Sequence, residues 1–194
     1  MQLANRLNMS ASDVTRCAIQ LALLISLSLG CGRSANPPYS QLPTAQTIYS
    51  SALKNAQIAN KPVFVVFTQD EFWCQQLDNF EADEDVARLL GKYFLLIHLR
   101  VDAHVGAEQL YYEHGSDRGV PAYAIIDPHG ETLADSGDVG QNIGFPNSDD
   151  EVQRYLKMLK TACPEITDEE QVLLRNKLEA RRVTDINNER TSQM

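Results

Sequence analysis

The stretch DEFWCQQLD, at residues 70–78, places a tryptophan and a cysteine between an apolar run and a predicted helix. A thiol at the start of a helix is acidified, because the helix dipole and the free backbone amides favour the thiolate. Such a thiolate attacks a disulfide bond and forms a mixed disulfide with its substrate. A second cysteine, three positions further on, then releases the reduced substrate, and here that position holds Leu77. Cys74 is therefore a candidate thiol without the usual second cysteine.

None of the other three cysteines is close enough in sequence to serve as the missing second cysteine of the motif. Cys17 lies in an apolar N-terminal segment and Cys31 at the end of that segment, which leaves Cys74 and Cys163 in the folded part. An exported domain with two cysteines can form one disulfide, but spacing alone does not show that they meet. We expect Cys163 to lie on the far side of the sheet from Cys74. Cys74 can equally be read as a small buried hydrophobe.

The elements that position Cys74 follow from the hydrophobic pattern. Continuous apolar runs predict two buried strands, at residues 63–67 and 93–101, and two further strands are predicted at 120–127 and 131–135. Helical periodicity predicts helices at residues 44–59, 83–90, 107–114 and 149–162, besides the one that follows Trp73. Alternating strands and helices imply parallel pairing, and the late hairpin adds an antiparallel edge. The sequence therefore predicts an α/β fold with a mixed central sheet between two layers of helices.

The first of these helices and one further helix carry more specific expectations. In the helix at 44–59, the apolar side is predicted to consist of Ile48, Ala52, Ala56 and Ile58. Beyond Pro164, a capping box at residues 167–170 starts a further helix with an apolar side at residues 172–178. This C-terminal helix either packs back on the domain or meets a partner. The chain is expected to fray from Val183.

Five segments carry a resemblance to the thioredoxin-like superfamily, between about Ala52 and Leu159. They are KPVFVVF at 61–67, Trp73-Cys74, LDNFEADEDVARLLGKYF at 77–94, IHLRVD at 97–102 and GVPAYAIID at 119–127. The sequence is most similar to the exported thioredoxin-7 type branch. The resemblance implies a three-layer α/β/α sandwich, a cis bond before Pro121, and protein or peptide thiols and disulfides as partners.

The active-site motif of that family aligns in two ways. In the first, Trp73-Cys74 is the leading pair, Cys74 is the nucleophile and Leu77 replaces the resolving cysteine. In the second, Cys74 matches the second cysteine and Glu71 occupies the position of the nucleophile. We favour the second, because it needs smaller gaps. This second alignment places Cys74 inside the first helical turn. The cysteine that would act as the nucleophile is then absent from the chain.

The remaining candidates have plain structural interpretations. Trp73 can cap the edge of the core, and Pro121 can be purely architectural. Asp70 and Glu71 could act as acid or base, or simply be solvated turn residues. The four histidines, at 98, 104, 114 and 129, show no metal-ligand spacing, so we expect no metal and no cofactor. No Gly-rich loop follows a strand, which argues against a nucleotide- or folate-dependent enzyme.

The N-terminus reads as an export signal. Residues 17–29 form an apolar run that is too short to span a bilayer, which needs roughly 20 residues. The ending LSLGC at 27–31 resembles the bacterial lipobox, although Ser28 stands where an aliphatic residue is usual, and it implies lipidation of Cys31. Ordinary signal cleavage, giving a soluble periplasmic or secreted protein, and an uncleaved anchor are the alternatives. Met9 could be the true start.

The predicted organisation is a signal at residues 1–31, a flexible linker at 32–43, a thioredoxin-like domain at 44–163 and a helical extension at 164–194. The net charge is -9, which disfavours nucleic acid as a partner. Two functions remain: a membrane-tethered envelope lipoprotein with single-cysteine or vestigial thiol–disulfide exchange, or a non-catalytic module that binds peptides or a partner protein. Any enzymatic activity is expected to be weak, because the second cysteine is absent.

Overall fold

The computed structural model describes residues 43–115, 119–137 and 141–192, with only the helical backbone for 183–192. The predicted signal, the lipobox-like ending and almost all of the linker lie outside these residues. Within the described part of the chain, none of the helices is both long enough and apolar enough to cross a membrane.

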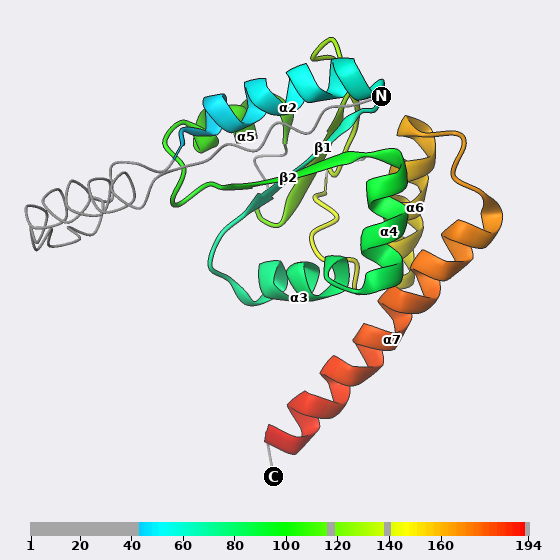
Figure 1. Cartoon of the computed structure of the whole chain (residues 1–194). Helices are drawn as coiled ribbons and strands as arrows, with labels where there is room; N and C mark the ends of the chain where they lie inside the picture. Colours follow the sequence, from blue (N-terminus) through cyan, green and yellow to red (C-terminus); the bar gives the residue numbers. More distant parts are fainter. Residues whose placement is uncertain (1–42, 116–118, 138–140, 193–194) are drawn as a thin grey trace, which may run out of the picture. The chain divides into compact units, whose positions relative to one another are not determined.

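A four-stranded mixed sheet forms the centre of the domain, in the order β2-β1-β3-β4 (Figure 1). Its strands are β1 (Val63–Thr68), β2 (Leu95–Arg100), β3 (Ala122–Ile126) and β4 (Thr132–Asp135). Every residue of β1 is buried, as the continuous apolar run predicts, because β1 has a neighbour on each side. The prediction of an α/β fold with a mixed sheet is confirmed.

The direction of β3 differs from the sequence prediction. β1 and β2 are parallel, with Thr68 opposite Arg100, but β3 is antiparallel to β1, with Ala122 opposite Phe67. The chain leaves β2 at the same end of the sheet at which β3 begins. Among its described residues, the connection contains one helix, the eight-residue α5 (Ala107–His114). This connection does not return the chain to the far end of the sheet, as a parallel crossover would require.

The expectation that residues 93–101 form a second fully buried strand is wrong. β2 is an edge strand, and four of its six residues are only half-buried. A strand at the edge of a sheet lacks a neighbour on one side, so its side chains and backbone stay partly accessible. His98, on this strand, is one of the half-buried residues.

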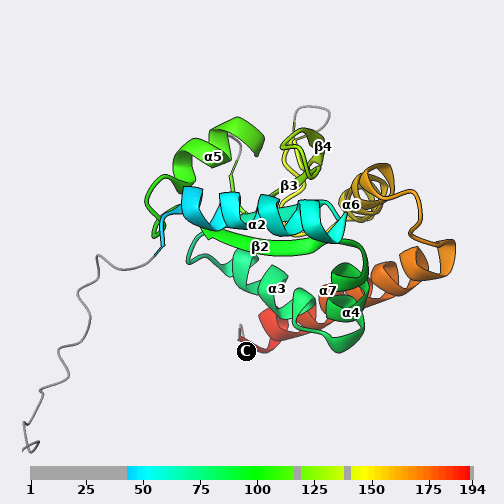
Figure 2. The ribbon, with the colours of Figure 1, turned by 45° about the horizontal axis from the view of Figure 1, so that its top comes forward.

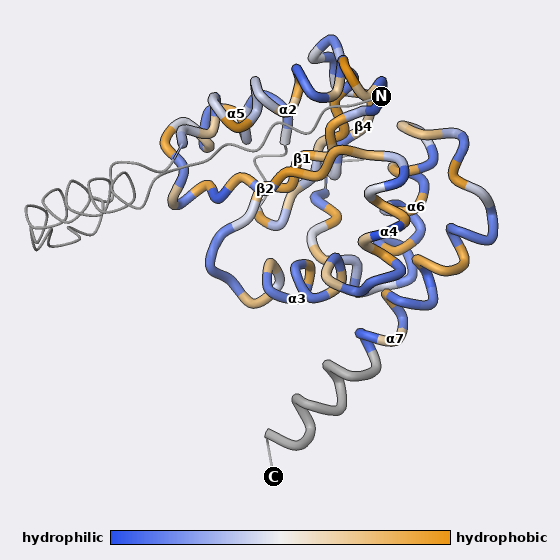
Figure 3. Tube along the Cα trace, viewed as in Figure 1, coloured by the Kyte–Doolittle hydropathy of each residue, from blue (hydrophilic) through white to orange (hydrophobic). Residues whose placement is uncertain are grey.

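Helices cover both faces of the sheet (Figures 1 and 2). One face carries α2 (Ala45–Ala59) and α5, and the other carries α3 (Phe72–Glu81), α4 (Glu84–Tyr93), α6 (Asp149–Ala162) and α7 (Asp168–Ser192). The pleat of β1 divides its side chains between two apolar clusters. Phe64 and Val66 pack under the four-helix layer, while Val63, Val65 and Phe67 pack under α2 and α5. Figure 3 accordingly shows β1 and most of β2 in the hydrophobic colour.

The buried side of α2 matches the expectation in part: Ala52 and Ala56 are buried and Ile48 packs against the same apolar cluster, but Ile58 does not. Ile58 is 86% exposed, whereas Tyr49 is buried beside Ala52 and Ala56. The buried residues recur at spacings of three and four, which keeps them on one side of a helix, and Ile58 falls outside that series. Thr44 caps the helix by accepting the Thr47 backbone N–H at 3.2 Å.

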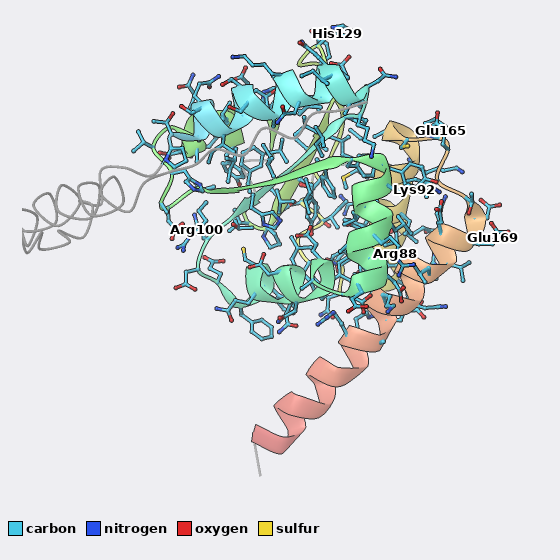
Figure 4. All side chains as sticks on the ribbon, viewed as in Figure 1. Arg88, Lys92, Arg100, His129, Glu165 and Glu169 are labelled. Carbon is cyan, nitrogen blue, oxygen red and sulfur yellow. The ribbon has the colours of Figure 1, made fainter. Side chains whose placement is uncertain are left out.

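Helix α7 packs back on the domain. The capping box is present: the Thr167 hydroxyl accepts the Glu170 backbone N–H at 3.3 Å, and the Glu170 carboxylate accepts the Thr167 backbone N–H at 2.9 Å. Leu174 and Leu178 are fully buried in the core under the four-helix layer. Lys92, labelled on α4 in Figure 4, forms an ion pair with Glu170 at 2.7 Å. The helical backbone continues to Ser192, past the predicted fraying point.

Candidate functional site

Cys74 lies inside the first turn of α3 and faces the interior. The helix begins at Phe72 with Glu71 as its N-cap, so Cys74 is its third residue. The thiol is 1% exposed, and its sulfur accepts the Gln69 backbone N–H at 3.4 Å. Burial raises the pKa of the Cys74 thiol, and the Gln69 amide opposes that rise only in part. The geometry describes a protonated, poorly accessible thiol at neutral pH.

Glu71 stands at the surface position that precedes the helix. Its side chain is exposed and makes no capping hydrogen bond with α3. In the second of the two alignments, this surface position corresponds to that of the family's nucleophile, and Cys74 to the second cysteine, one turn further in; the choice between the alignments stays a prediction. A carboxylate cannot form a mixed disulfide, so this surface position carries no sulfur chemistry. The roles of Cys74 and Glu71 themselves remain predictions.

Three aromatic rings gather at the start of α3. The Trp73 indole stacks on the Phe145 ring, with centroids 6.2 Å apart and planes inclined by 16°. Phe72 meets Trp73 edge-on, with centroids 5.0 Å apart. Phe145 is buried, while Trp73 remains 40% exposed. Stacking on a buried ring fixes the indole at the surface without covering its outer face.

A groove of about 390 Å³ runs beside this aromatic cluster. Its described lining residues are Trp73, Gly119, Val120, Pro121, Asn142, Ile143, Gly144, Phe145, Asn147, Ser148 and Glu151. The Val120–Pro121 peptide bond is cis, the geometry that the resemblance implies. Trp73 and Pro121 therefore share one groove. Cys74 is not among the described residues that line it.

Two side chains that sequence reasoning missed hold the segment before Pro121. The Asn142 amide donates to the carbonyl oxygens of Gly119 at 2.8 Å and Pro121 at 2.9 Å. The Tyr111 hydroxyl accepts the Gly119 backbone N–H at 3.0 Å. Gly119 has φ = 104°, a value that L side chains rarely adopt. Asn142 belongs to a loop without hydrophobic periodicity, so no sequence pattern predicted that its side chain would hold the segment around Pro121.

Cys163 does not reach Cys74. Both are free thiols, and the expected placement on opposite faces of the sheet is wrong. Cys163 belongs to the core under the four-helix layer, which includes α3. It lies instead beyond the other end of the strands, near the start of β2: its thiol contacts Glu165, and the Glu165 carbonyl accepts the Tyr93 hydroxyl. The two cysteines therefore lie on the same face of the sheet but near opposite ends of its strands.

A second polar cluster lies further along α3. One ligand atom from each of Asp78, Glu81 and His98 lies within 4.8 Å of the corresponding atoms of the other two. Asp78 and Glu81 are three residues apart on α3, so they project from the same side, towards β2. Sequence reasoning found no metal-ligand spacing because His98 is distant in the chain and comes alongside only through packing.

A family model described as thioredoxin-like matches residues 44–128. A disulphide isomerase from Xylella fastidiosa Temecula1 has a similar structure, with a TM-score of 0.50, 21% identity, and coverage of 63% of this chain and 95% of that one. The domain therefore has a thioredoxin-like fold. The match to the family model includes β1, Cys74 and Pro121, so the superfamily's site region is part of it.

Other similarities to this thioredoxin-like domain are weaker. A thioredoxin from Thermus thermophilus matches with a TM-score of 0.38 and 26% identity, over 45% of this chain and 69% of that one. An oxidoreductase named DsbH matches with a TM-score of 0.40 and 18% identity, over 60% and 82%. No curated protein matches the sequence.

Proposed function

We propose that this thioredoxin-like domain binds polypeptides in the groove beside Trp73, Pro121 and Phe145 and does not catalyse rapid disulfide turnover. The observation that carries this proposal is the placement of Cys74, which is buried and absent from the described groove lining. A nucleophilic thiol must be both ionised and accessible. The pKa of Cys74 is raised by burial, and the surface position before it is Glu71.

The groove has the features of a polypeptide site. An exposed indole offers a large, rigid apolar surface at small cost in conformational entropy. Phe145 supports the ring from behind, so the outer face is free to meet an apolar side chain. Asn142 and Tyr111 fix the backbone at Gly119, which keeps the segment around the cis bond in one conformation. Preorganisation of this kind lowers the ordering cost of binding.

The ligands that fit the fold best are polypeptides that carry thiols or disulfides. A solved structure with a similar fold is named as a disulphide isomerase, and a domain without rapid turnover can still hold such chains. A second candidate function is single-cysteine exchange through Cys74. The Gln69 backbone N–H favours it, because an amide that donates to sulfur stabilises the thiolate. This function requires the first turn of α3 to open.

Intrinsic fluorescence tests binding directly, because Trp73 is the only tryptophan in the chain. We would titrate the full chain with a reduced, fully alkylated model protein, which offers unfolded polypeptide without thiols. Binding is expected to shift and saturate the emission of Trp73. Phe145→Ala should weaken the affinity about tenfold or more, because removing a buried aromatic anchor typically costs 2 kcal/mol or more.

The matched control is Ile58→Ala, which removes an equally apolar but exposed side chain from α2, outside the described groove lining. Its affinity should equal that of the wild type. An emission spectrum that stays constant throughout the titration would refute the binding function. Rapid reduction of insulin disulfides by the wild type, lost in Cys74→Ser, would instead support exchange and overturn the proposal of a non-catalytic module.

We further propose that the chain is exported and anchored through a lipid on Cys31, facing the periplasm or the cell exterior. The apolar run at 17–29 and the LSLGC ending support this, with the Pro- and Ser-rich stretch after Cys31 as a tether. Labelling bacteria that express the chain with a radioactive fatty acid should label the wild type but not Cys31→Ser. Equal labelling of both would exclude Cys31 as the acceptor, and a cytosolic chain would exclude export.

A further inference from the structure

We propose that Asp78, Glu81 and His98 form a binding site for one divalent transition-metal ion, of which Zn²⁺ is the representative. The site is separate from the groove: none of the three residues is among its described lining residues. Two carboxylates come from α3 and one imidazole from the edge strand β2.

The separations suit ligands of a single ion. Glu81 Oε2 lies 2.9 Å from His98 Nε2, and Asp78 Oδ1 lies 3.5 Å from His98 Nδ1. Two ligands bonded at ~2.1 Å to a tetrahedral ion are roughly 3.4 Å apart, and one ligand atom from each of the three residues lies within 4.8 Å of the other two. The two carboxylates contact different nitrogens of the ring, so the Asp78 side chain must turn towards the Glu81 side of the ring for both to bind one ion. One ring nitrogen would bind the ion and the two carboxylates would complete the protein ligands. Asp78, which is 58% exposed, and half-buried His98 leave access for water in the remaining position.

The state of Glu81 points independently to a cation. Its side chain is only 5% exposed, and Oε1 is buried without a hydrogen-bond partner among the described residues. Burying a carboxylate is costly unless it is paired and hydrogen-bonded. Glu81 is also the last residue of α3, where the helix dipole adds further negative potential. The imidazole of His98 is the one basic group that the structure pairs with it within the described residues.

The donor set selects the class of metal. Imidazole nitrogen with carboxylate oxygen suits Zn²⁺, Fe²⁺ or Mn²⁺, whereas Mg²⁺ and Ca²⁺ prefer oxygen ligands alone. The fixed partners are Glu81, held by the core, and His98, held by the pairing of β2 with β1, in which it lies opposite Val66. Asp78 is the exposed ligand, able to adjust its side chain to the ion.

The test uses the full chain stripped of metal with a chelator and titrated with ZnSO₄ in a calorimeter, beside a parallel titration with MgSO₄. We expect one Zn²⁺ per chain, a rise in the midpoint of thermal unfolding, and no heat with Mg²⁺. Asp78→Asn and His98→Gln should each weaken Zn²⁺ binding by roughly 10-fold or more. Asp78→Asn alters an exposed side chain, so it tests the site even if a variant at buried Glu81 fails to fold.

The matched control is His129→Gln. His129 is exposed at the turn before β4, and Figure 4 shows it far from α3. Its Zn²⁺ affinity should be unchanged. Absence of Zn²⁺ uptake by the wild type would overturn the proposal. So would uptake that survives Asp78→Asn and His98→Gln but disappears in Cys74→Ser, or Mg²⁺ binding as tight as Zn²⁺ binding.

Discussion

The indole of Trp73 and the ring of Phe145 lie nearly parallel, 6.2 Å between centroids, and join the start of α3 to the loop before α6. Phe145 is buried in the core and Trp73 is partly exposed, so the pair connects the interior with the groove. The groove therefore depends on a contact between residues 72 positions apart.

Phe145→Ala should destabilise the domain and change the environment of Trp73. Truncation of a buried phenylalanine typically costs about 3 to 5 kcal/mol, from lost burial and the cavity left behind. The emission of Trp73 is expected to move to longer wavelength as its inner face meets water. Urea unfolding followed by circular dichroism measures the first effect, and fluorescence of the folded variant the second. Unchanged emission would mean that the stacked pair is not maintained in solution.

Cys74 should react slowly with iodoacetamide in the native state. Burial raises the pKa of its thiol, so less thiolate is present at neutral pH and the sulfur is also covered. We expect the rate at pH 7.5 to be at least about tenfold lower than in urea, and to keep rising with pH above 9. Mass spectrometry of the peptide that contains Cys74 separates it from the other cysteines. A fast rate that levels off near neutral pH would indicate a catalytic thiolate.

Helix α7 should contribute to the stability of the domain through Leu174 and Leu178. Both are fully buried, so Leu174→Ala and Leu178→Ala should each lower the free energy of unfolding by about 2 to 5 kcal/mol. Val172→Ala, on the same helix but exposed, is the control and should change stability by about 0.5 kcal/mol or less. Equal stability of all three variants would show that α7 does not dock.

The ion pair between Lys92 and Glu170 should make the docking of α7 sensitive to acid. Lys92 lowers the pKa of Glu170 from 4.5 to about 2, with help from the Thr167 backbone N–H. Because the folded state binds the proton less tightly than the unfolded chain, the stabilisation is present above pH 4.5 and is lost as the pH falls towards about 2. Both side chains are partly exposed, so the effect should be modest.

Urea unfolding of the wild type and of Glu170→Gln, measured from pH 7 to pH 2, checks this expectation. The stability difference between the two should be largest above pH 5 and should shrink as the pH falls. A difference that is constant across this range would attribute the effect of Glu170 to its hydrogen bonds with Thr167 and Tyr93 alone.

Local patterns determined most of the elements of this domain. The run VFVVF specified β1, because a strand with neighbours on both sides buries every residue. The capping box at Thr167 marked the start of α7, because its side-chain oxygen satisfies a free backbone amide. The Gly-Val-Pro segment indicated the cis bond through the family resemblance.

Tertiary packing decided what local patterns leave open. Three features depend on how the elements pack against one another: the direction of β3, the exposure of Ile58 and the burial of Cys74. Packing involves residues that are far apart in the chain, so a local pattern does not predict it. The same is true of the stacking of Trp73 on Phe145 and of the grouping of His98 with two acids of α3. The sequence by itself predicted a thioredoxin-like scaffold and a single cysteine, Cys74, near the start of the helix that follows β1. Only the fold placed that cysteine's sulfur inside the core, because the first turn of α3 directs its third residue towards the interior.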